Sequence, residues 1–413
     1  MARVQLHLGL SVIALTGLLC GCVGGDGTTT AAMAKAPVAN VAKLTVDTGP
    51  SAAPGQVNHA YVTVKVCAPG SQSSCASIDH VLLDTASNGL RLVGSVLSAQ
   101  AVSLPNETDA QGQNVEECVG FAGGQTWGPV ATGDVYLAGE KASKVPLQIM
   151  DDAGAGAPAP STCGANGTLI NDVAGFGANG VLGVGVFAQD CGEACVSPGT
   201  PLPIYYGCST AGACAAENAP LALQVTNVVS AFTADNNGVI VNLPNLVSAN
   251  GDVSVQGELI FGISTQTDNM LPASGLTVLG TDANGDFKAS YNGSATLLPA
   301  LIDSGTDAYA FDDQTIPTCS TGAFVGYYCP TVAPQPASAQ NIGVGVNDAV
   351  NTVNFAIADP NTFVVGAAAY ANLAGGGGSS FFTWGMPFFY GRKIYVDIDQ
   401  RSSGAYVGPF YAY

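Results

Sequence analysis

Charge is scarce in this sequence, and positive charge is the scarcest. Only 10% of the 413 residues are charged, and 11 Lys and Arg stand against 30 Asp and Glu, for a formal net charge of -19. Such an acidic chain repels a phosphate backbone, so we expect no nucleic-acid partner. Histidine is equally rare. Beyond the N-terminal segment only His59 and His80 remain, and neither has the spacing to cysteine of a zinc site, so we expect no metal.

Long hydrophobic runs are missing after the N-terminus, where no stretch is long enough to span a bilayer. At the N-terminus, Arg3 precedes the apolar run LHLGLSVIALTGLL, the layout of a secretory signal. The segment ends in Leu19-Cys20-Gly21-Cys22, which resembles a bacterial lipobox. The resemblance implies a signal peptide over 1–22 and acylation at Cys22, which a flexible tether over 23–44 follows. We expect an exported protein, lipid-anchored in the bacterial cell envelope, with plain cleavage and release as the alternative.

Cysteine is present in a number that suits an exported protein. Of 12 cysteines, Cys20 and Cys22 belong to the signal, which leaves an even number. In an oxidising compartment these favour disulfides over metal ligands. The expected pairs are Cys67–Cys75, Cys191–Cys195, Cys208–Cys214 and Cys319–Cys329 by proximity, and Cys118–Cys163 as the remainder.

Turn formers and short β-branched segments dominate the rest of the chain, which contains 53 Gly, 23 Pro and 47% hydrophobic residues. Segments such as HAYVTVKV, NGVIVNL and KIYVDID predict strands and hairpins with few helices. Residues 330–340, PTVAPQPASAQ, are expected to form an irregular surface loop. Because one core stops growing at about 250–300 residues, we expect two β lobes, over 45–230 and 231–413.

Two distant segments share one pattern, an apolar strand that ends in Asp and continues as hydroxyl, small and hydroxyl residues. The first is VLLDTAS at 81–87 and the second is ALIDSGT at 300–306. Burying a carboxylate on an apolar strand is costly unless a partner shares its charge. If the lobes pack with pseudo-twofold symmetry, Asp84 and Asp303 meet and share one proton, so that one acts as base and the other as acid.

The hydroxyl residues that flank each aspartate repeat as well. Thr85 and Ser304 follow the aspartates and are placed to bond to the backbone of the opposite lobe. Ser87 and Thr306 are placed to bond their own carboxylate. A third copy of the looser pattern Asp-Ser/Thr-Gly/Ala, Asp47-Thr48-Gly49, precedes no apolar strand and lies too close to the first motif for a separate lobe, so we interpret it as a chance match.

The paired motifs resemble those of the pepsin-like aspartic peptidases, one apolar-apolar-Asp-Thr/Ser-Gly-Ser/Thr motif per lobe. NGVLGVG at 179–185 and FTWG at 382–385 resemble the family's later apolar segments, and VGPFYAY at 407–413 its closing strand. The blocks keep the family's order from about residue 60 to 413, and the layout is also similar to an uncharacterised bacterial family of exported proteins with this fold. The resemblance implies an all-β, bilobal, pseudo-twofold fold with catalytic Asp84 and Asp303.

Two departures from the family pattern are visible. Ala86 replaces the glycine of the first motif, which adds a methyl group where backbone amides approach the carboxylate. The segment expected to form the flap hairpin over the substrate, CVGFAGGQTWG at 118–128, lacks the family's tyrosine. Phe121 or Trp127 is expected to cover the cleft instead, with packing in the core as the alternative.

The resemblance implies a monomeric aspartic endopeptidase that needs no cofactor and takes peptide or protein substrates between the lobes. The two departures motivate a second hypothesis, a catalytically inactive surface lipoprotein that uses the same cleft to bind peptides or a protein partner. A third hypothesis, a structural β-sandwich of the envelope, predicts no shared cleft between Asp84 and Asp303.

Overall fold

The computed structural model describes residues 39–154, 156–163, 167–197 and 199–413. The predicted signal peptide, Cys22 and most of the predicted tether lie outside the described residues. Residues 38–413 form one compact unit. None of the helices in the described ranges combines the length and apolar character needed to cross a membrane.

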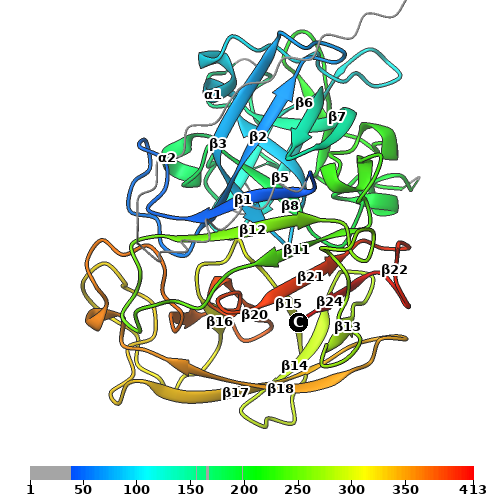
Figure 1. Cartoon of the computed structure of the whole chain (residues 1–413). Helices are drawn as coiled ribbons and strands as arrows, with labels where there is room; N and C mark the ends of the chain where they lie inside the picture. Colours follow the sequence, from blue (N-terminus) through cyan, green and yellow to red (C-terminus); the bar gives the residue numbers. More distant parts are fainter. Residues whose placement is uncertain (1–38, 155, 164–166, 198) are drawn as a thin grey trace, which may run out of the picture. The chain divides into compact units, whose positions relative to one another are not determined.

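The described chain is built almost entirely of strands, which confirms the all-β prediction (Figure 1). The largest sheet has 15 strands. In neighbour order these are β10 (Cys214–Ala216), β9 (Tyr205–Cys208), β5 (Asn114–Phe121), β6 (Gly124–Leu137), β7 (Glu140–Met150), β4 (Asn88–Val93), β8 (Gly180–Val184), β3 (Cys75–Asp84), β2 (Ala60–Cys67), β1 (Val41–Val46), β12 (Val255–Phe261), β11 (Gly238–Asn242), β21 (Lys393–Asp397), β24 (Phe410–Ala412) and β13 (Val278–Gly280).

A second sheet of 7 strands comes entirely from the C-terminal half. Its neighbour order is β18 (Val350–Ile357), β17 (Gln335–Ile342), β14 (Phe287–Tyr291), β15 (Leu298–Ile302), β20 (Phe382–Trp384), β16 (Tyr309–Phe311) and β19 (Ala374–Gly376). A small hairpin pairs β22 (Ser402–Ser403) with β23 (Tyr406–Val407). The described helices are α1 (Gly94–Ala99), α2 (Val173–Phe176) and the 3₁₀ turns η1 (Gly192–Cys195), η2 (Leu221–Leu223), η3 (Val228–Ala231), η4 (Pro360–Thr362) and η5 (Met386–Phe388).

Alternation of apolar and polar side chains explains why these segments form strands. In β2, Val62, Val64 and Val66 are buried while Thr63 and Lys65 are exposed, the period of two that one buried face requires. The prediction of an irregular loop over 330–340 is confirmed for 330–334 and wrong for 335–340, because β17 begins at Gln335. Its inward residues are mostly alanines, whose low β propensity hides the alternation in the sequence.

Each predicted motif ends a strand in the same local topology. β3 pairs in parallel with β8, which in turn pairs antiparallel with β4. In the second half, β15 pairs in parallel with β20, which pairs antiparallel with β16. The repetition is the structural basis of the pseudo-twofold relation. The first-half and second-half strands meet where β1 pairs with β12, as the blue and green strands of Figure 1 show.

The boundary that we placed between residues 230 and 231 falls inside η3. Strands from both sides of it belong to the large sheet, so the division into two separate domains at this point stays a prediction. The bilobal arrangement of strands is nevertheless clear, since each half carries its own copy of the motif topology.

Candidate active site

Asp84 ends β3 with its carboxyl group turned back onto the following loop. Its side chain is only 7% exposed. One oxygen accepts hydrogen bonds from the backbone amides of Ala86, at 2.9 Å, and Ser87, at 3.2 Å. The other oxygen accepts from the Ser87 hydroxyl at 2.6 Å. Three donors thus converge on this carboxyl group.

Asp303 follows β15 and lies in the equivalent loop. Its carboxyl group accepts from the Gly305 amide at 2.7 Å and from the Thr306 hydroxyl at 2.6 Å. Burial, together with the nearby charge of Asp84, raises the pKa of Asp303 well above its ordinary value. With two donors against three, the charge of Asp303 is the less well compensated of the two, which favours the shared proton on Asp303.

Hydroxyl groups lock the two loops together in a reciprocal set of four hydrogen bonds. The Thr85 hydroxyl donates to the Ile302 carbonyl at 2.7 Å and accepts from the Ser304 amide at 3.0 Å. The Ser304 hydroxyl donates to the Leu83 carbonyl at 2.7 Å and accepts from the Thr85 amide at 3.2 Å. Both hydroxyl residues are fully buried. The two loops therefore hold a fixed relative position.

The two carboxyl groups lie against the same glycine. A methyl group added at Gly305 would sit 3.0 Å from the Asp84 carboxyl carbon and 3.1 Å from an Asp303 oxygen. The corresponding residue of the first loop is Ala86, whose backbone is not in the left-handed region. Neither position therefore needs glycine for its backbone conformation, and what glycine provides at 305 is space beside the carboxyl groups.

Tyr411 is a residue of this site that the sequence analysis missed. It lies on β24 and is buried, and its hydroxyl donates to the Thr85 carbonyl at 3.2 Å. Burial and the nearby carboxylates, Asp303 first and then Asp84, raise the pKa of this phenol, so it stays a neutral donor. The closing segment VGPFYAY was recognised in the sequence, but no local pattern connects its tyrosine to residue 85.

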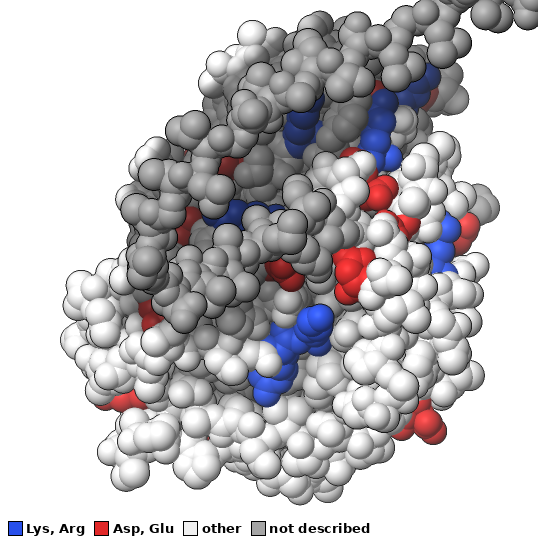
Figure 2. All heavy atoms as spheres, in the orientation of Figure 1, with Lys and Arg blue, Asp and Glu red and all other residues white. Residues whose placement is uncertain are grey.

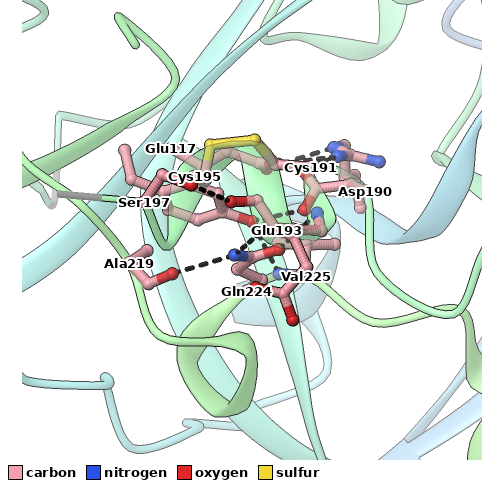
Figure 3. The surroundings of a disulfide bond; sticks show 12 residues. Glu117, Asp190, Cys191, Glu193, Cys195, Ser197, Ala219, Gln224 and Val225 are labelled. Carbon is pink, nitrogen blue, oxygen red and sulfur yellow. Dashed lines mark hydrogen bonds and ion pairs between the residues drawn. A yellow bond between two sulfur atoms is a disulfide. The ribbon is translucent and has the colours of Figure 1, made fainter. Parts of the chain in front are cut away.

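A cavity of about 920 Å³ opens beside the paired loops. Ala86, Leu301 and Tyr411 line it next to the motifs, and residues 186–194 and 399–401 form its outer walls. The Cys191–Cys195 disulfide closes a short loop at the end of the 186–194 wall. The Gln224 side chain forms hydrogen bonds with the Gly192 backbone in this loop (Figure 3). On the face drawn in Figure 2, most of the described surface carries neither acidic nor basic side chains.

The segment expected to form the flap is a hairpin of β5 and β6. At its tip, the Phe121 ring meets Phe176 edge-on with centroids 5.4 Å apart and packs with Leu82 and Val181. Leu82 lies two residues before Asp84 on β3, so both side chains are on the same face of that strand. The hairpin tip therefore packs on the face that carries the aspartate.

Trp127 lies on β6, the second strand of the hairpin, and its side chain is buried. Its side chain is 2% exposed, its indole nitrogen donates to the Ala157 carbonyl at 2.7 Å, and it packs against Tyr206 and the Cys118–Cys163 disulfide. Of the two aromatic residues proposed to cover the cleft, the structure brings Phe121 to the aspartate face and places Trp127 in a packing role.

All five predicted disulfides are confirmed. They are Cys67–Cys75, Cys118–Cys163, Cys191–Cys195, Cys208–Cys214 and Cys319–Cys329. Within the described residues, one cluster of three potential metal ligands occurs, at Cys319, Cys329 and Asp359. Its two sulfur atoms are joined in a disulfide, so neither is a thiolate and the cluster does not fit a metal.

Asp47, from the third copy of the Asp-Ser/Thr-Gly/Ala pattern, does not join the paired loops. Its carboxyl accepts from the Gly49 amide at 2.9 Å and lies 3.4 Å from His80. His80 in turn bonds its neighbour Asp79 at 2.7 Å. These contacts belong to the turn after β1 and to β3.

The fold and the paired loops define the class, a pepsin-like, bilobal all-β protein. Among solved structures, the chain is similar to the aspartic proteinase from Irpex lacteus, with a TM-score of 0.50 and 14% sequence identity, over 90% of this chain and 96% of that one. At this identity the likeness concerns the fold. The chain belongs to the family described as "Protein of unknown function (DUF3443)", which matches residues 36–413. A search of the curated proteins found no match.

Proposed function

We propose that the protein is an aspartic endopeptidase in which Asp84 and Asp303 form the catalytic dyad. The observation that carries the proposal is the reciprocal locking of the two loops through Thr85 and Ser304, which holds two carboxyl groups against one glycine. A shared proton between like charges gives one base and one acid at the same place. The adjoining cavity supports a substrate that extends along the loops.

The donor pattern assigns the roles. Asp84 is charged and removes a proton from a water molecule, whose oxygen forms a bond to the peptide carbonyl carbon. Asp303 gives its proton to the carbonyl oxygen in the same step. In the second step the proton on Asp84 passes to the amide nitrogen, the carbon–nitrogen bond breaks, and a hydroxyl proton of the intermediate returns to Asp303. The dyad ends in its starting state.

The decisive experiment compares cleavage of a peptide library by the purified protein and two dyad variants from acid to neutral pH. Asp84→Asn and Asp303→Asn are each expected to abolish cleavage, because each leaves the dyad without its base or acid. Asp47→Asn is the matched control, since it alters an aspartate in a similar tripeptide, Asp47-Thr48-Gly49, outside the dyad. Cleavage that survives in Asp303→Asn, or that is absent from the parent, contradicts the proposal.

A second candidate, an inactive pepsin-fold protein that binds peptides or a protein partner, is motivated by Ala86 and by the hairpin without a tyrosine. Peptide affinity that persists in Asp84→Asn, with no product from the parent, favours it over the peptidase.

Export and a lipid anchor at Cys22 complete the proposal. The five disulfides support an oxidising compartment. Metabolic labelling with a radioactive fatty acid is expected to mark the parent and not Cys22→Ser. Equal labelling of both contradicts the anchor.

A further inference from the structure

An ion cluster with a fully buried Arg91–Glu117 pair joins β4 to the β5–β6 hairpin and does not include the dyad residues. The Arg91 guanidinium on β4 donates to both Glu117 oxygens, at 3.1 and 2.6 Å, and to Asp190 at 3.1 Å. Arg91 is 1% exposed and Glu117 is 0% exposed. The mechanism proposed above uses none of these groups.

Stability alone does not explain such a cluster. Taking three charges out of water costs several kcal/mol per ion, and packed apolar side chains of similar volume often stabilise a fold as well or better. The role of a buried cluster therefore follows from the chain segments that it holds in place. Here the fork of the guanidinium reaches three separate segments, the β5–β6 hairpin, the cavity wall at Asp190 and the loop of the first aspartate motif.

The first segment is the β5–β6 hairpin. Glu117 lies on β5, four residues before Phe121, and the Phe121 ring lies 5.8 Å from the Arg91 guanidinium. The buried Gln148 on β7 secures the same hairpin, because its amide donates to the Glu117 carbonyl at 2.8 Å and accepts from the Thr126 hydroxyl at 2.8 Å. Gln148 thus forms hydrogen bonds with both strands of the hairpin.

The second segment is the outer wall of the cavity. Asp190 lines the cavity and precedes the Cys191–Cys195 loop (Figure 3). Its second oxygen accepts from the Tyr205 hydroxyl at 2.6 Å. Through Asp190, the Arg91 side chain is tied directly to a surface that a substrate would contact.

The third segment is the loop of the first aspartate motif. Arg91 donates to the Asn88 carbonyl at 2.9 Å, and Asn88 follows Ser87, whose hydroxyl bonds Asp84. The Asn88 side chain also accepts from the Phe187 amide at 3.1 Å, at the start of the cavity wall. One guanidinium therefore touches the hairpin, the wall and the dyad loop.

We propose that Arg91 is a positioning residue that fixes the β5–β6 hairpin and the Asp190 wall relative to the dyad, so that a peptide is held in register for hydrolysis. The inference rests on the peptidase function proposed above. Arg91 acts through Glu117, Phe121 and Asp190 and does not touch the reacting atoms.

The test combines amide hydrogen exchange with steady-state kinetics on the full chain. Arg91→Lys keeps the positive charge but loses the planar guanidinium that bonds several partners at once. Glu117→Gln keeps the shape of the Glu117 side chain but removes its negative charge, and the Asp190 carboxylate still faces Arg91. We expect exchange in the hairpin, residues 117–128, to accelerate roughly tenfold in both variants. We expect kcat/KM to fall roughly ten- to hundredfold, mainly through KM, because misplaced binding surfaces cost that much.

Arg392→Lys is the matched control, since Arg392 also bonds a backbone carbonyl, that of Phe388, and stacks on its ring at 4.4 Å. It should alter neither hairpin exchange nor KM.

Unchanged hairpin exchange in a folded Glu117→Gln protein overturns the inference, as does amide exchange that accelerates equally in both halves of the chain. If Arg91→Lys does not fold, Glu117→Gln decides. If the parent cleaves nothing, the proposed function fails alone and the exchange data still decide the role of Arg91.

Discussion

The Thr85 hydroxyl makes two of the four hydrogen bonds that join the motif loops. In Thr85→Val the shape is kept, but the Ser304 amide and the Ile302 carbonyl lose their partner in a buried place. Each such group costs about 1–3 kcal/mol, so we expect the free energy of unfolding to fall by about 2–4 kcal/mol. Chemical denaturation measures it. Thr45→Val, at an exposed hydroxyl that bonds to Gln256, should change stability by less than about 0.5 kcal/mol.

Space beside the carboxyl groups is a second residue-level property. Gly305→Ala would put a methyl group 3.0 Å from the Asp84 carboxyl carbon, inside the usual carbon contact of about 3.5–4.0 Å. The carboxyl must shift, so we expect kcat to fall about tenfold or more while the protein stays folded by circular dichroism. The reverse change at the other loop, Ala86→Gly, should leave kcat at least as high as in the parent. A Gly305→Ala enzyme with the parent's kcat would show that this space is not needed.

Residue types near the dyad were predictable where the pattern is local. In each motif the aspartate and its two hydroxyl residues lie within three positions of one another, so the sequence shows them as one pattern. Arg91 was missed because its partners Glu117 and Asp190 lie 26 and 99 residues away. Only the folded sheet brings these side chains together, and a single buried arginine in a strand leaves no local signal.

Strands are predictable from the sequence where apolar and polar residues alternate along them. Strands with β-branched residues on the inward face, such as β2, are visible in the sequence, whereas the alanine-lined β17 has the composition of a loop. Hairpin disulfides followed from proximity, since Cys67–Cys75 and Cys208–Cys214 each join neighbouring strands. Sheet order was out of reach, because the pairing of β1 with β12 joins segments more than half of the chain apart.

The disulfides also differ in how much chain they close, which gives a prediction at the level of elements. Cys118–Cys163 spans 45 residues and ties β5 to the segment beneath Trp127, whereas Cys191–Cys195 spans 4. Because longer closed loops restrict the unfolded chain more, replacing both cysteines at 118 and 163 by alanine should lower the free energy of unfolding by about 2–4 kcal/mol. The same change at 191 and 195 should cost less. Paired denaturation curves test the order, and an equal or reversed order contradicts it.

For the whole molecule, the carboxyl groups set the pH dependence of stability. Burial raises the pKa of Glu116 and of Glu217 to about 7 and that of Asp397 to about 8, and for Glu217 the charge of Asp109 adds to the effect. In the unfolded chain such groups titrate near about 4. Between these values the folded state holds protons that the unfolded state has lost, so stability falls as the pH rises from about 4 to 8.

Other groups work against this trend. Burial lowers the pKa of His59 to about 4, so its contribution to stability rises with pH up to its unfolded value of about 6.5. Hydrogen bonds to Lys141 and to the Lys144 and Gly70 amides lower the pKa of Asp134 against the effect of burial. The raised carboxyls outnumber these groups, and a net charge of -19 adds self-repulsion at neutral pH. The protein should therefore be most stable in acid.

Asp397 offers the sharpest check of this balance. It is fully buried, one oxygen accepts from the Ser403 hydroxyl, and the other has no hydrogen-bond partner among the described residues. Asp397→Asn cannot ionise, so the midpoint of thermal unfolding should decline less between pH 4 and 8 than in the parent, and should be higher than in the parent at pH 8. Asp399→Asn, at a partly exposed carboxyl two residues further on, is the control and should keep the parent's slope. A parent whose unfolding midpoint rises steadily from pH 4 to 8 would mean that the raised carboxyls do not govern the stability of this fold.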